Sequence, residues 1–192
     1  SMLSILIFQW FSSHKFKAIG VIFIVIPGIF LTAYQTSNSF HQRVDSAIDN
    51  IVSYEEDKST SVGLRITYAI NSWEVIIKNP IIGVGTGDFP LEYHKITQIN
   101  NPNLPSTTNP HNMYILILMQ LGLIGLISFL SIFYYQIKFS ITSNNKFISD
   151  VGITLPLLFL IIMWSDSYLL GHFTTLVYVF FSSFLYKNFE KS

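Results

Sequence analysis

Residues 112–137, NMYILILMQLGLIGLISFLSIFYYQI, form an uninterrupted stretch without a charged side chain. A helix needs about 20 consecutive apolar residues to cross a bilayer, so this stretch predicts a transmembrane helix. Half of the chain's 192 residues are hydrophobic and only 11% are charged, whereas a soluble domain carries about 25% charged residues. The sequence therefore predicts an integral membrane protein.

Three further apolar stretches, at residues 16–34, 151–169 and 173–186, also predict transmembrane helices. A run at 2–11 is too short to cross and is interpreted as the end of a truncated helix, which makes the chain the C-terminal part of a longer protein. The predicted fold class is an all-α polytopic membrane protein with about four complete transmembrane helices and a truncated N-terminal one.

The predicted organisation has three parts: transmembrane helices in 1–34, a large loop domain in 35–111, and the C-terminal transmembrane helices in 112–192. Lysines in the short segments beside the helices set the orientation, because such residues favour the cytoplasmic side. If every helix crosses, all of them fall on one side: Lys15, Lys17, Lys138, Lys146, Lys187 and Lys191. The large loop is then predicted to lie outside the cytoplasm.

The loop has the pattern of folded structure. Residues 39–54 show helical periodicity, and residues 62–78 predict a stronger amphipathic helix. Asn79-Pro80 ends this helix, a glycine-rich turn covers 81–89, and residues 100–110 are irregular. The predicted apolar stripe of the second helix consists of Val62, Ile66, Ala69, Ile70, Trp73, Ile76 and Ile77. Such a helix can pack on the membrane surface or against the transmembrane helices.

Composition also excludes several kinds of site. The chain has no cysteine, so it has neither disulfides nor thiolate metal ligands. Its formal net charge is zero, whereas a nucleic-acid partner calls for a basic patch. The histidines lack metal-ligand spacing. The sequence therefore predicts no metal, no cofactor and no nucleic-acid partner.

His111 is the first candidate for chemistry. Asn109 and Pro110 fit the N-cap and first position of a helix, which places His111 in the first turn. The helix dipole favours a neutral imidazole there, and such a group at the membrane boundary is suited to act as a general base. The alternative is a polar cap at the interface.

Other candidates lie in the loop and between the last two helices. Arg65 flanks the apolar stripe and can bind a phosphate with its planar fork, or lie on the surface as a snorkelling side chain. Gly83, Gly85 and Gly87 form either an anion-binding nest of amides or a tight turn. Gly122 and Gly125 predict close helix packing. The ionisable pair Asp166 and His172 lies at the outer ends of the last two helices, where ionisable groups are functional candidates.

Taken in order, these segments resemble a known family. Arg65 and Trp73 stand in an Arg-x7-Trp pattern, followed by NPIIGVGTGDF at 79–89, PHNMY at 110–114 and QLGLIGL at 120–126. This order is similar to the signature region of the O-antigen ligase and O-antigen polymerase superfamily, which includes protein O-oligosaccharyltransferases. The resemblance covers about residues 63–126 and the topology of a large outer loop between two transmembrane helices.

The resemblance implies a GT-C-like fold in the bacterial inner membrane, multi-pass, with the large loop in the periplasm. It implies a metal-independent glycosyltransferase that moves a glycan from a polyprenyl-diphosphate carrier to an acceptor hydroxyl. Arg65 and His111 match the family's loop arginine and histidine and are the expected catalytic residues. Expected substrate-binding residues within the matching motifs are Trp73, Gly83, Gly85, Gly87, Asn112 and Tyr114.

The sequence leaves the acceptor open. The first expectation is an O-antigen ligase that transfers O-antigen to the lipid A core; the alternatives are an O-antigen polymerase and a protein O-oligosaccharyltransferase. A hypothesis from a different class is a fragment of a polysaccharide transporter or flippase. A transporter is expected to have broken helices and charged groups near the bilayer midplane, whereas the predicted transmembrane helices carry almost no charge there.

Overall fold

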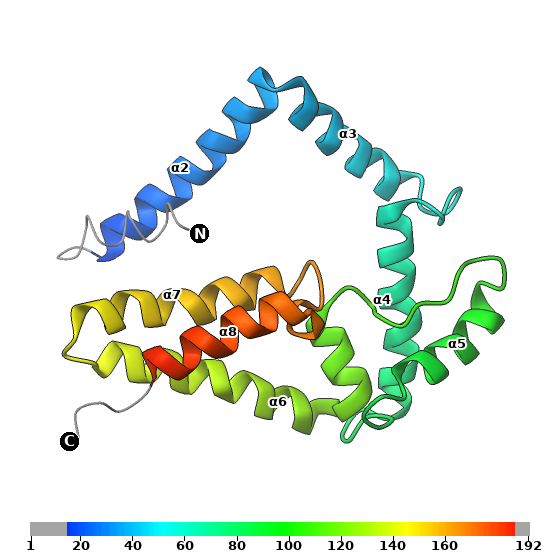
Figure 1. Cartoon of the computed structure of the whole chain (residues 1–192). Helices are drawn as coiled ribbons and strands as arrows, with labels where there is room; N and C mark the ends of the chain where they lie inside the picture. The colour runs from blue at the N-terminus through cyan, green and yellow to red at the C-terminus, as the bar shows by residue number, and fades with distance from the viewer. Residues whose placement is uncertain (1–14, 187–192) are drawn as a thin grey trace. The chain divides into compact units, whose positions relative to one another are not determined.

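The computed structural model describes residues 15–186, so the predicted truncated helix at 2–11 lies outside the described residues. Every regular element within 15–186 is a helix, which confirms the all-α prediction (Figure 1). The elements are α2 (Lys15–Thr36), α3 (Asn38–Val52), α4 (Ser61–Lys78), α5 (Phe89–Asn100), α6 (Met113–Thr142), α7 (Lys146–Ile162), the 3₁₀ helix η1 (Tyr168–Leu170) and α8 (His172–Leu185).

The chain divides into two compact units, residues 1–63 and residues 64–192. In the first unit α2 packs against α3, and Ser37 between them caps α3 by accepting a hydrogen bond from the Phe40 amide. The Tyr34 hydroxyl donates to Asp45 Oδ1 at 2.7 Å, and the Tyr34 ring stacks on His41. These contacts join the two helices at the corner between them, and α3 confirms the predicted helix at 39–54.

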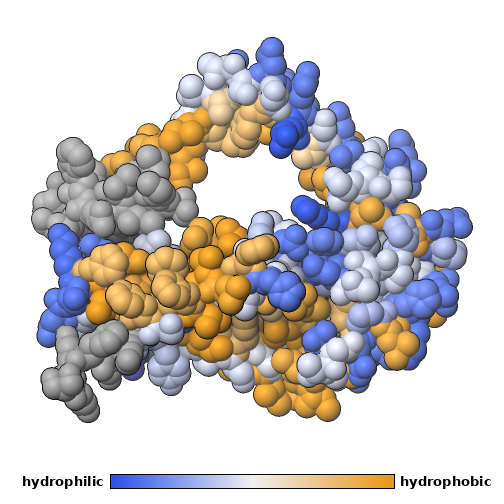
Figure 2. Space-filling model, in the orientation of Figure 1, coloured by the Kyte–Doolittle hydropathy of each residue, from blue (hydrophilic) through white to orange (hydrophobic). Residues whose placement is uncertain are grey.

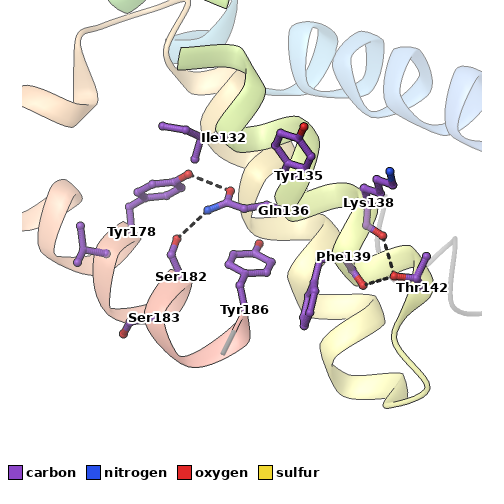
Figure 3. A pocket seen from close by; sticks show the side chains of 11 residues that line it. Ile132, Tyr135, Gln136, Lys138, Phe139, Thr142, Tyr178, Ser182, Ser183 and Tyr186 are labelled. Atoms are coloured by element: carbon purple, nitrogen blue, oxygen red, sulfur yellow. Dashed lines mark hydrogen bonds between the residues drawn. The ribbon is translucent and has the colours of Figure 1, made fainter. Parts of the chain in front are cut away.

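The second unit contains a bundle of α6, α7 and α8, which run side by side (Figure 1). Tyr178 and Ser182 of α8 point toward Gln136 of α6 (Figure 3). The Tyr178 hydroxyl donates to Gln136 Oε1 at 2.9 Å, and Gln136 Nε2 donates to Ser182 Oγ at 3.2 Å. These bonds satisfy polar groups between apolar helices, as in membrane helix packing.

Among the residues that the structure describes, α6 is the one helix whose length and apolar composition suit a membrane crossing. The predicted stretch at 151–169 is interrupted, because α7 ends at Ile162 and a turn with η1 leads into α8. The number of membrane-crossing helices therefore remains a prediction.

The predicted uninterrupted helix at 112–137 is wrong in one respect, because α6 breaks at Gly122. This residue has φ 63° and ψ −162°, in a region that favours glycine. A Cβ at Gly122 would lie 2.3 Å from the Ile81 carbonyl oxygen. The close approach predicted for this glycine therefore does occur, but its partner is the loop turn, not another helix.

Residues 80–85 fill this break with backbone hydrogen bonds, an arrangement that we name the turn–α6 junction. The amides of Val84 and Gly85 donate to the carbonyls of residues 119 and 120 at 2.9 and 3.0 Å. The amides of residues 123 and 124 donate to the carbonyls of Pro80 and Ile81 at 2.9 and 3.2 Å. A helix break leaves carbonyls and amides without partners on its two sides, and the turn supplies partners to both.

The predicted stripe of α4 is also corrected. Ile70, Trp73 and Ile77 are 53%, 54% and 61% exposed. The buried face carries polar and apolar side chains: Thr67, Tyr68, Asn71, Ser72, Val75 and Ile76. Asn71 is accommodated because partners come from elsewhere in the loop: its Nδ2 donates to Asn101 Oδ1 at 3.1 Å and to the hydroxyl of Tyr93, which lies on α5, a helix that the sequence did not predict.

Candidate functional site

His111 lies directly before α6, and its backbone has φ 52°. The predicted cap at Asn109 is wrong, because Asn112 is the N-cap: its side chain accepts from the amides of Tyr114 and Ile115 at 3.0 and 3.1 Å. Asn109 instead accepts a hydrogen bond from the His111 amide at 3.0 Å. The two asparagines therefore hold the histidine at the mouth of the helix, outside its first turn.

Asp166 fixes the imidazole from the other side. The distance from His111 Nδ1 to Asp166 Oδ1 is 3.1 Å, and the same oxygen accepts from the Ser167 amide at 2.7 Å. Burial raises the pKa of Asp166, but the hydrogen bonds from Ser167, His111 and Asn109 outweigh it and hold that pKa below its ordinary value. An ionised carboxylate only accepts hydrogen bonds, so Nδ1 carries the proton.

The Nε2 atom of His111 is therefore the ring atom left for chemistry. In a neutral imidazole whose Nδ1 is protonated, Nε2 has a free lone pair. Within residues 15–186 no hydrogen bond to this atom is formed, and the side chain is 37% exposed. This arrangement suits a group that removes a proton from an incoming hydroxyl. We call His111, Asp166 and the residues that hold them the histidine corner.

Tyr68 connects the histidine corner to α4. Its buried ring stacks on the His111 ring with 6.1 Å between centroids and 22° between planes, and it meets the Tyr93 ring edge-on. Arg65 lies three residues before Tyr68, so both belong to one side of α4. Arg65 is exposed, and no acidic side chain in the described part of the chain pairs with it. Its guanidinium is therefore free to bind an anion on the side of the helix that carries Tyr68.

The two other residues expected at the start of α6 join it to the end of α7. Asn112 Nδ2 donates to the Trp164 carbonyl at 3.1 Å, and the Tyr114 hydroxyl donates to the Leu160 carbonyl at 2.5 Å. Their polar atoms are thus already used. Asn112 and Tyr114 hold His111 near Asp166 in this structure, and they do not reach out into solvent.

The remaining expected substrate-binding residues do not gather here. Trp73 lies on the exposed apolar face of α4, which is turned away from Tyr68. The amides of Gly83 and Gly85 donate to the carbonyls of Asn79 and Gln120, so they are not free for an anion. Gly87 has a positive φ of 89° and open space around it. The structure therefore supports the turn interpretation of these glycines over the nest.

Asp166 is the site residue whose role the sequence did not reveal. Its position between two apolar stretches marked it as an interfacial ionisable group, but nothing local linked it to a histidine 55 residues earlier in the chain. His172, marked with it, starts α8 and is exposed. No group of three or more His, Cys, Asp or Glu side chains within 15–186 is arranged to hold a metal ion.

Comparison with known proteins identifies the family. The family described as O-Antigen ligase matches residues 1–130, more than half of the chain. A similar protein of Haemophilus influenzae (strain Rd), named only "Uncharacterized protein", is 31% identical over 137 residues; the match covers 67% of this chain and 34% of that protein. The chain thus spans about a third of the length of this relative, and Asp166 lies beyond the family match.

The family match confirms the resemblance that the motifs indicated. The chain belongs to the O-antigen ligase family.

Proposed function

We propose that this chain carries the catalytic loop of a glycosyltransferase that moves a glycan from a polyprenyl-diphosphate carrier to an acceptor hydroxyl, with the O-antigen ligase reaction as first choice. The observation that carries the proposal is the geometry of the histidine corner. His111 is oriented by Asp166 through Nδ1 at 3.1 Å, and its Nε2 is left open. Within the family already established, this geometry is that of a general base.

The proposed reaction uses two groups of the loop. His111 Nε2 accepts the proton of the acceptor hydroxyl as its oxygen attacks the anomeric carbon of the donor glycan. The bond between that carbon and the diphosphate oxygen breaks, and the diphosphate leaves with the carrier lipid. Arg65 neutralises the charge that develops on the leaving group, because a guanidinium binds phosphate oxygens in a bidentate manner. No step of this scheme needs a metal ion.

Asp166 acts in this scheme as a positioning residue. It keeps the proton on Nδ1 and stabilises the imidazolium that forms when Nε2 takes up a proton. The ring of Tyr68 stacks on the face of the His111 ring. Arg65 lies about one helical turn before Tyr68 on α4. The loop is proposed to face the periplasm of a bacterial inner membrane, where the carrier lipid stays in the bilayer and its diphosphate lies at the surface.

The transporter hypothesis draws on one observation, the break in α6, because broken helices form ion sites in transporters. In this chain the turn–α6 junction satisfies both sides of the break with backbone hydrogen bonds. The free helix ends that would bind a substrate ion are therefore occupied, and we prefer glycosyl transfer.

The proposed function can be tested by analysing the chain lengths of the lipopolysaccharide in a strain from which the gene is deleted. An O-antigen ligase predicts loss of all long chains and accumulation of carrier-linked polymer. A core with a single repeat indicates the polymerase, and normal lipopolysaccharide with unglycosylated protein indicates the protein-directed enzyme. Normal lipopolysaccharide and normal protein glycosylation would contradict the proposal.

A further inference from the structure

An apolar surface on the loop is left uncovered in the structure. It consists of five exposed side chains, which we name the isoleucine stripe: Ile70, Trp73, Ile77, Ile81 and Ile82. The first four recur at helical spacing, and the Gly83 amide donates to the Asn79 carbonyl at 3.0 Å, so a helical turn continues past the end of α4. Ile81 and Ile82 are 62% and 72% exposed.

The stripe is continuous with the apolar surface of α6. The Ile81 carbonyl accepts from the Ile124 amide at 3.2 Å, so the turn lies directly against the start of the second part of α6. Leu123, Ile124 and Ile127 of that part are also exposed. Figure 2 shows apolar side chains gathered at the lower edge of the view, where the turn after α4 meets the bend of α6 in Figure 1.

The length of the second part of α6 matches a membrane. Beyond the break, 20 of the helix's 30 residues remain, at 123–142. With a rise of about 1.5 Å per residue they span about 30 Å, the thickness of the hydrocarbon core. Residues 113–121 are then not needed to cross the bilayer.

The length of the antiparallel neighbour α7 independently indicates how far the start of α6 lies from the turn at 143–145. Its 17 residues run back from the turn at 143–145 for about 25 Å. Its end is tied to the start of α6, because the Met113 amide donates to the Met163 carbonyl at 3.0 Å. Both ends of segment 113–121 therefore lie about one membrane thickness from the same turn, which is the geometry expected of a segment that runs along a membrane surface.

We propose that the isoleucine stripe contacts the lipid of the bilayer interface on the loop side, so that α4 and the 80–85 turn are anchored in the membrane surface. Lipid is the expected partner of the stripe, because the stripe is continuous with the apolar surface of the part of α6 that is long enough to cross the membrane. Trp73 fits this position, because tryptophan favours the boundary between lipid and water. The anchor holds α4, and with it Arg65, at the level of the histidine corner.

The test uses single cysteines, because the sequence contains none. Ile77→Cys and Ile82→Cys carry nitroxide labels in protein reconstituted into phospholipid vesicles, and Asn103→Cys, an exposed polar position in the same unit, is the control. Collisions with molecular oxygen, which dissolves in lipid, are compared with collisions with a water-soluble nickel chelate. We expect the labels at positions 77 and 82 to collide more often with oxygen than with the chelate, and the label at position 103 to collide more often with the chelate.

Two results overturn the proposal. Chelate access at 77 and 82 equal to that at 103 would place the stripe in water. Protection of 77 and 82 from both reagents would mean that protein covers it. A second measurement avoids the labels: with Trp10→Phe and Trp164→Phe, brominated lipids are expected to quench Trp73, and unquenched emission would contradict the proposal. Both experiments read lipid contact, so their outcome is separate from the transferase activity.

Discussion

The turn–α6 junction and the histidine corner both attach the loop to the bundle, but they use different chemistry. The junction consists of four backbone hydrogen bonds around Gly122, and it needs the absence of side-chain atoms. The histidine corner consists of side-chain contacts among His111, Asp166 and Tyr68. Because of this difference, substitutions at the junction should affect folding, whereas substitutions at the histidine corner should affect glycan transfer in a folded protein.

The largest effect is expected for Gly122→Ala. The new Cβ would meet the Ile81 carbonyl oxygen at 2.3 Å, in a backbone conformation that alanine avoids. We expect a loss of roughly 3 kcal/mol of stability and loss of transfer as a consequence, measured by thermal unfolding in detergent. Gly28→Ala is the control, because nothing lies within 4 Å of its added Cβ. Equal stability of the two variants would contradict the junction.

Arg65→Ala should leave the fold intact and lower transfer by roughly 10²–10³-fold, the loss typical for one group that stabilises developing charge. Arg65→Lys should restore little of the rate, because a point charge does not reproduce the bidentate fork. The measurement is the transfer rate of purified protein, with Arg43→Ala as the arginine control. Normal transfer by Arg65→Ala would show that Arg65 is a snorkelling surface side chain.

Asp166→Asn should lower transfer by roughly 10–100-fold, as for other partners that orient a histidine. The amide can still hydrogen-bond to the ring, but it no longer fixes the proton on Nδ1 or stabilises the imidazolium. The informative readout is the pH profile of the transfer rate, which should change shape in Asp166→Asn and stay unchanged in the control Asp150→Asn. Identical profiles in wild type and Asp166→Asn would reject the positioning role.

The smallest effect concerns stability against pH. The pKa of Asp166 is lower in the folded protein than its ordinary value of 3.8. Its ionised form therefore stabilises the fold above that ordinary value, and this contribution is lost as the pH falls through the lowered pKa. Wild type should be more stable than Asp166→Asn at pH 7, and the difference in stability should shrink as the pH falls through the lowered pKa of Asp166. A constant difference in melting temperature would contradict the lowered pKa.

The sequence predicted the elements whose signals are local. Periodicity indicated α3 and α4, and Asn79-Pro80 correctly marked the end of α4. The break in α6 escaped prediction, because Gly122 and Gly125 in an apolar run are typical of helix packing. The break becomes stable only when residues 80–85, far away in the sequence, supply partners for its backbone.

Only part of the candidate site was predicted, because only some of its features have a local signal in the sequence. Arg65 and His111 were proposed from ordered motifs and remain predictions as site residues, but the pairing of His111 with Asp166 joins distant segments that no local pattern connects. The buried face of α4 was misassigned because Thr67 and Asn71 have the polarity of surface residues; Asn71 can be buried because Tyr93 of α5 and Asn101 of the loop accept its hydrogen bonds. The cap was misassigned because Asn109 and Asn112 both fit it, and Pro110 favoured the first.

The most direct test of the central claim is His111→Ala, with donor binding and transfer measured separately. His172→Ala, an exposed histidine at the start of α8, is the matched control. Losing the general base should lower transfer by roughly 10²–10⁴-fold, while binding of the polyprenyl-diphosphate donor and thermal stability remain at the wild-type level. Transfer by His111→Ala at the rate of His172→Ala would contradict the account.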